Sequence, residues 1–203
     1  MLKLTQYLAI IGLMLSNTIS AQHEKCASSH MQNQLIKEQA GYADALLANE
    51  RQIQSIIARK KRSKTTEDVL TIPVVIHVVH LGESIGVGNN ISEEQITSGI
   101  TQLNEGFRNE NGLGLDLKIE FELAVLDPNC ASTTGILRVD GSGVSGYSTN
   151  GVLSSSIGAD ETAVKALSIW SNTDYYNIWL VSEFDGNDGG NGTQGFAYFP
   201  GAS

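Results

Sequence analysis

Few side chains of this 203-residue sequence could carry out metal or nucleophilic chemistry. Its cysteines and histidines are Cys26, Cys130, His23, His30, His77 and His80. HExxH, CxxC, GxSxG and P-loop motifs are all absent from the sequence. His77 and His80 are three residues apart on an expected strand, so they should point to opposite faces and not share one metal. We interpret His77 as a hydrogen-bonded histidine of the core or sheet.

The two cysteines allow several interpretations. An exported chain with two cysteines could form one disulfide. Cys26 and Cys130 lie in what look like different segments, so each could instead bind a metal or pair with a cysteine that this chain lacks.

An acidic, glycine-rich loop over 185–194 is a candidate calcium site. Oxygen-bearing side chains stand at alternate positions in Asp185–Gly189, as they do in calcium loops. The bidentate glutamate that closes such loops is missing, which favours a plain acidic turn and leaves calcium as the alternative.

The beginning of the chain has the pattern of a secretory signal. Lys3 precedes a nine-residue apolar run, Tyr7–Leu15, and small residues lead to Ala21. A bilayer span needs about 20 apolar residues, so a signal cleaved near Ala21 is favoured over an anchor. We therefore expect a signal peptide over 1–21, secretion, and no membrane association after the signal is removed.

Charge is divided unevenly along the chain. The sequence has a net charge of −9, with +4 on residues 22–65 and −14 on residues 66–203. An acidic main part argues against nucleic acid and anionic membranes as partners.

Residues 22–65 are expected to form a helical leader that ends in a basic linker. Apolar residues recur at three- and four-residue steps up to Ile57, and the run Arg59–Lys64 follows. An exposed basic run could be a solvated linker or a protease-sensitive junction between a propeptide and a mature domain.

Residues 66–203 read as a mixed α/β unit. Leu70–His80 is rich in β-branched residues and predicts a buried strand. Ser92 and Gln95 form a capping box for an amphipathic helix that ends near Asn109. Further expected elements are a strand over 117–126, a surface loop over 140–158, a short helix over 160–170, a strand over 175–184 and an edge strand over 195–200. This order of strands and helices predicts a mixed α/β sheet.

Several segments together resemble the pappalysin branch of the metzincin metalloproteases. The segments are Ile72–His80, Ile91–Arg108 with its LNxxFR pattern, Ile119–Ala124 with Asp127–Pro128, Thr134–Ile136 with Arg138–Val139, Tyr176–Val181, and Gly195–Gly201. Their order and spacing over about 130 residues carry the resemblance. It implies the N-terminal half of a metzincin-like catalytic domain over 66–203, preceded by a helical propeptide over 22–65.

The resemblance implies a secreted zinc metalloendopeptidase precursor that acts on protein or peptide substrates. In the family, zinc is held by an HExxHxxGxxH segment and activates a water molecule. That segment would follow the last strand, so the zinc ligands are expected downstream of Ser203 and this fragment is expected to be inactive. The chain stops after a strand-like segment, which we interpret as truncation.

Two site assignments come from the same resemblance. Cys26 would be a zinc ligand that holds the precursor latent, although Ala27 replaces the glycine usual after this cysteine. Gly195, Phe196, Ala197 and Tyr198 would form the edge strand that pairs with an extended substrate, unless they are a plain sheet edge.

Two other functions compete with a protease precursor. One is a non-enzymatic, exported binding or adhesin-like α/β domain that keeps the sheet without the zinc segment. The other is an inhibitor that acts in trans through the Cys26 leader.

Overall fold

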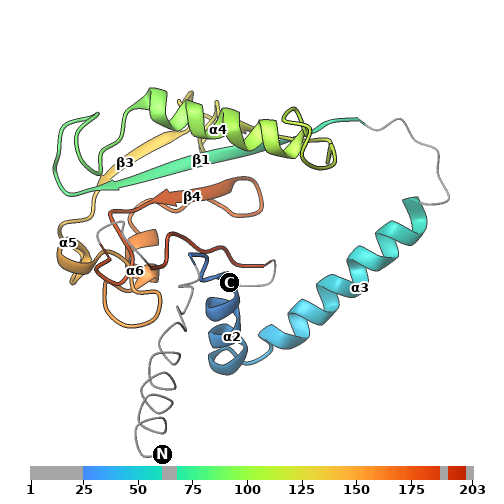
Figure 1. The fold of residues 1–203 in the computed structure, drawn as a ribbon, viewed down its shortest axis with the longest axis horizontal. Helices are drawn as coiled ribbons and strands as arrows, with labels where there is room; N and C mark the ends of the chain where they lie inside the picture. Colours follow the sequence, from blue (N-terminus) through green and yellow to red (C-terminus); the bar gives the residue numbers. More distant parts are fainter. Residues whose placement is uncertain (1–24, 61–67, 188–191, 200–203) are drawn as a thin grey trace, which may run out of the picture.

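The fold consists of a small parallel sheet, helices around it and a helical leader (Figure 1). The structure, a computed structural model, describes residues 25–60, 68–187 and 192–199. The expected signal peptide over 1–21 and most of the basic linker lie outside these ranges. Among the described helices, none combines the length and the hydropathy that crossing a bilayer requires.

The leader contains two helices instead of the continuous one expected. These are α2 (Ser28–Glu38) and α3 (Tyr42–Lys60). The break falls at Gly41, whose φ of +87° is a left-handed backbone conformation that glycine adopts without steric cost. Ala27, Met31 and Tyr42 are buried, whereas most of α3 extends away from the sheet (Figure 1).

The sheet is built around the long strand β1 (Leu70–His80). The shorter strands are β2 (Ile119–Leu123), β3 (Ile136–Asp140) and β4 (Tyr176–Leu180), and each pairs with β1 in parallel. The expected strands over 117–126 and 175–184 are thus confirmed in shorter form.

Strands β2 and β3 follow one another along the same edge of β1. Val74 accepts a hydrogen bond from the amide of Ala124, and the amide of Ile76 donates to the carbonyl of Gly135. A Cβ atom on Gly135 would lie 2.7 Å from the amide nitrogen of Ala124. Gly135 therefore lets the end of β2 and the start of β3 meet closely enough to share this edge.

One face of the sheet is covered by α4 (Glu93–Phe107). The predicted capping box is present, because the Ser92 side chain accepts from the amide of Gln95 while the Gln95 side chain accepts from the amide of Ser92. Ile96 of this helix packs with alternate residues of β1 and with Phe121 of β2. The amphipathic pattern thus predicts the helix and its buried face correctly.

The other face is covered by the chain after β3, which includes α5 (Tyr147–Asn150) and α6 (Glu161–Lys165). Tyr147 is fully buried, donates to the carbonyl of Val79 and accepts from the amide of Ser182. Val152 and Ala159 are buried beside it. The expectation of a surface loop over 140–158 is therefore wrong for Tyr147 and Val152, and the helix expected over 160–170 is shorter.

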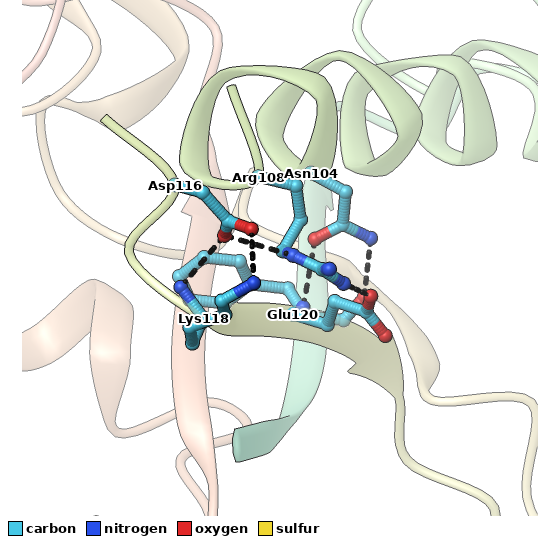
Figure 2. Close-up of polar contacts among 6 residues, drawn as sticks. Asn104, Arg108, Asp116, Lys118 and Glu120 are labelled. Atoms are coloured by element: carbon cyan, nitrogen blue, oxygen red, sulfur yellow. Dashed lines mark hydrogen bonds and ion pairs between the residues drawn. The ribbon is translucent and has the colours of Figure 1, made fainter. Parts of the chain in front are cut away.

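A polar network joins the end of α4 to β2 (Figure 2). Asn104 donates to the carbonyl of Phe121 and accepts from its amide, at 2.9 and 2.8 Å. Arg108 pairs with both Asp116 and Glu120. Hydrogen bonds from Lys118, and then the Arg108 guanidinium, lower the pKa of Asp116 to about 2.

His77 is a fully buried histidine of the sheet, as predicted. Its Nε2 lies 2.9 Å from Oδ1 of Asn177, and its Nδ1 lies 2.9 Å from Oγ of Ser168. An amide oxygen can only accept, so Nε2 carries the proton and Nδ1 accepts from the Ser168 hydroxyl. Burial lowers the pKa of His77 and favours this neutral form, while the hydrogen bond to Asn177 acts in the opposite direction.

We expect Asn104→Ala to lower the free energy of unfolding by about 2 kcal/mol, because it leaves two main-chain groups of buried Phe121 without their partners. Urea unfolding measures this loss. Asn111→Ala is the matched control, since it also removes a side-chain acceptor for a main-chain amide, but in an exposed loop. Equal losses in the two variants would contradict the proposed role of Asn104.

We expect His77 to make stability depend on pH. Its pKa in the folded state lies below 6.5, so the unfolded chain binds more protons as the pH falls. The stabilisation is complete above pH 6.5 and is lost as the pH falls from there toward the folded-state pKa. Urea midpoints between pH 8 and pH 5.5 should fall less steeply for His77→Gln than for the native chain. A native slope in His77→Gln would contradict the assignment.

Candidate functional site

The structure brings the two predicted site segments together. The amide of Ala27 donates to the carbonyl of Gly195 at 3.0 Å, and the amide of Gln194 donates to the carbonyl of Lys25 at 2.7 Å. Cys26 and Gly195 form a parallel bridge. The leader segment Lys25–Ser28 thus lies along the segment Gln194–Tyr198, which is far from it in sequence.

Ser28 extends this pairing by one hydrogen bond. Its Oγ accepts from the amide of Ala197 at 2.8 Å, and the Cys26 thiol donates to the same oxygen at 3.3 Å. The carbonyl of Ala27 is already used by Met31 in the first turn of α2. The Ser28 hydroxyl therefore provides the acceptor where the main chain has turned into a helix.

The prediction of an edge strand over 195–200 is wrong in one respect. The described residues 195–199 pair with no strand of the sheet, and their one bridge is to Cys26. The segment is held by its own side chains and not by main-chain pairing with the sheet. Phe196 and Tyr198 are half-buried, whereas Ala197 and Phe199 are exposed, which is the alternation of an extended chain with one covered face.

The covered face of this segment lies against α6 and Phe184. The hydroxyl of Tyr198 donates to Glu161, and the ammonium of Lys165 lies 4.7 Å from the centre of the Tyr198 ring. Burial raises the pKa of Tyr198, and the Glu161 carboxylate raises it further. Tyr198 therefore remains a neutral hydrogen-bond donor.

A cleft of 490 Å³ opens beside Cys26. Its leader side includes Cys26 and His30, and its other side includes Ser154–Ser156 and Asp185. Both side chains of the leader are exposed, so the cleft is accessible to solvent. It presents polar groups at the point where the leader meets the rest of the protein.

Asp185 determines the shape of this cleft. Its Oδ1 accepts from four consecutive main-chain amides, those of Ser154–Ile157, at 3.0–3.3 Å. The hydroxyls of Ser154 and Ser155 donate to Oδ2. Burial acts to raise the pKa of Asp185, but these hydrogen bonds outweigh it and hold the pKa well below its ordinary value.

The calcium alternative is weakened by this arrangement. Both carboxylate oxygens of Asp185 are directed at donors of the 154–157 segment, so they are not available as the first ligand of a calcium loop. Residues 188–191 of the loop lie outside the described ranges.

The described residues do not assemble a zinc site. In ranges 25–60, 68–187 and 192–199, no three His, Cys, Asp or Glu side chains are grouped so that they could hold a metal. Cys26 and Cys130 form no disulfide with each other, so a disulfide between them is not part of this structure. Both ring nitrogens of His77 are hydrogen-bonded, to Ser168 and Asn177. Cys26, the metal ligand predicted from the sequence, lies at the leader contact.

Three contributors to the site were missed by sequence reasoning. Ser28 resembled an ordinary helix-start residue, and the serines of 154–156 resembled a surface loop. Lys165 stands out only because residues 66–203 have four lysines and arginines in total. That scarcity is a signal that a cation there has a specific partner.

The chain was compared with protein-family models, curated proteins and solved structures. No protein-family model matches the sequence, and no curated protein is significantly similar to it. A mutant of promirolysin from Tannerella forsythia is 30% identical, with a TM-score of 0.52, over 76% of this chain and 49% of that one. Mature mirolysin from the same organism, in complex with a cleaved peptide, is 32% identical over 55% of this chain and 42% of that one, with a TM-score of 0.41.

The chain thus spans about half the length of the promirolysin structure that it matches. The mixed α/β fold of this chain, with its mostly parallel sheet, resembles the fold of promirolysin.

Proposed function

We propose that this chain is the N-terminal part of a secreted zinc metalloendopeptidase precursor, and that its leader holds the enzyme latent. The observation that carries the proposal is the pairing of Lys25–Ser28 with Gln194–Ala197. A peptidase binds its substrate as an extended strand through main-chain hydrogen bonds. The leader uses the main-chain groups of Gln194–Ala197 that such a strand would need.

The extent of the similarity to promirolysin supports a leader that is a propeptide. Residues 66–203 make up about two thirds of this chain, whereas the match covers 76% of it. Some of the matched residues therefore precede residue 66, where the proposed propeptide lies. We accordingly propose 1–21 as signal peptide, 22–65 as propeptide and 66–203 as the N-terminal part of the catalytic domain.

In this proposal the catalytic zinc ligands lie downstream of Ser203, and Cys26 adds one ligand from the leader. Cys26 would contribute a thiolate, which is a good zinc ligand. Its thiol lies at the open cleft and is exposed, so a metal brought there by the rest of the enzyme could reach it. Protein or peptide substrates would then compete with the leader for Gln194–Tyr198.

The coding sequence that follows the Ser203 codon gives the first test. We expect an open frame that encodes HExxHxxGxxH, and the precursor expressed from it should bind one zinc and cleave casein. The 203-residue chain, expressed as the matched control, should bind no stoichiometric zinc and leave casein intact. A stop codon directly after Ser203, or casein cleavage by the 203-residue chain that a chelator abolishes, would overturn this assignment.

Latency is tested by Cys26→Ala in the precursor. Loss of the thiolate should speed self-activation, because the leader then lacks its zinc ligand and keeps only its hydrogen bonds and its buried side chains. Gel analysis of propeptide release over time measures the rate. Cys130→Ser is the control, since Cys130 is exposed in a turn remote in sequence from the leader. An unchanged rate in Cys26→Ala would rule out the thiolate as the latency element.

A further inference from the structure

Lys165 lies where α6, β4 and the segment Gly195–Tyr198 meet. Its Nζ is 4.7, 5.3 and 5.9 Å from the ring centres of Tyr198, Trp179 and Phe196, respectively. The same nitrogen is 3.0 Å from a carboxylate oxygen of Glu161. One ammonium group therefore contacts two aromatic residues of the segment and one of the sheet.

These contacts lie in a partly buried environment, where electrostatic attraction is stronger than at the open surface. Only 27% of the Lys165 side chain and 22% of the Glu161 side chain are exposed. A cation within about 6 Å of an aromatic ring is attracted by the ring face, and the attraction strengthens as water is removed. A half-buried ammonium between rings and a carboxylate is thus more than an ordinary surface charge.

Positively charged side chains are rare in residues 66–203, the acidic part of the chain. Residues 66–203 contain four lysines and arginines, and the other three hold the sheet and α4 together. Arg108 and Lys118 pair with Asp116, and Arg138 donates to Asn90 and Ile91. Lys165 is the cation that contacts the segment Gly195–Tyr198.

The contact with Lys165 fixes the orientation of the whole segment. Phe196 and Tyr198 are alternate residues of an extended chain, so holding both side chains on one face sets the direction of the main chain between them. The amide of Ala197 consequently points to one side of the extended chain, where it donates to Oγ of Ser28. The Tyr198 hydroxyl adds a second restraint through Glu161, which is also the partner of Lys165.

We propose that Lys165 is a positioning residue that holds Gly195–Tyr198 ready to bind an extended peptide strand. In this structure the strand is the leader segment Lys25–Ser28. That the same surface receives a substrate once the leader is gone rests on the proposed function.

The experiment measures amide hydrogen exchange by NMR in the full 203-residue chain. Lys165→Met keeps the length of the side chain but removes its charge. We expect the amides of Ala27, Gln194 and Ala197 to exchange roughly 5- to 30-fold faster, the effect of losing a cation–π contact of one to two kcal/mol. Amides of β1 should be unaffected.

Two further variants separate positioning from a general loss of stability. Lys165→Arg retains a cation over the rings and should restore most of the protection. Lys118→Met also removes a lysine ion pair, 2.7 Å from Asp116, and should leave the three leader-contact amides unchanged. In the native chain the Hε protons of Lys165 should resonate upfield because aromatic rings surround them.

Unchanged exchange at these amides in Lys165→Met would overturn the proposal, as would an equal acceleration of the β1 amides. Hε protons of Lys165 at ordinary chemical shifts would overturn it too. Hydrogen exchange requires no catalysis, so these results are independent of whether the precursor cleaves a substrate.

Discussion

The structure depends on one strand that is hydrogen-bonded along both edges. β1 pairs with β2 and β3 on one side and with β4 on the other, and all three partners run parallel to it. Parallel neighbours require crossover connections, and those connections must cover both faces. Val74, Ile76 and Val78 of β1 therefore pack under α4, while Val79 packs under the chain that follows β3.

The second face is held by polar contacts as much as by apolar packing. The Tyr147 hydroxyl hydrogen-bonds to Val79 of β1 and to Ser182, just after β4. The Asp185 carboxylate accepts hydrogen bonds from the amides of 154–157. Gly151 allows the close approach, because a Cβ there would lie 2.0 Å from the carbonyl oxygen of Glu183. These contacts fix the chain that leads out of β4, and that chain leads to the segment beside the leader.

Local patterns were sufficient to predict elements that are stabilised locally. For α4 and β1, the residues that predict the element all lie within it. These residues are the capping box at Ser92 with the amphipathic pattern after it, and the β-branched run around Val75. The segment Gly195–Tyr198 was predicted as extended, but its partners could not be found from sequence. Its main chain pairs with Cys26 and its side chains with Lys165, and neither is a neighbour in sequence. Similarly, Ser154–Ser156 reads as a surface loop until Asp185 is placed beside it.

The leader is attached at its beginning and extends into solvent at its end. Ala27, Met31 and Tyr42 are buried, whereas Leu47 of α3 is 55% exposed. Three hydrogen bonds join Lys25–Ser28 to the opposing segment, and each contributes about 1 kcal/mol. The burial of Ala27, Met31 and Tyr42 adds to these hydrogen bonds. The chain also joins the two segments covalently, and this tether makes their contact intramolecular. In the proposed precursor, a cut in the basic linker after Arg59 would remove that tether without touching the contact. The leader would then be held by its non-covalent contacts alone, so dilution would favour its release.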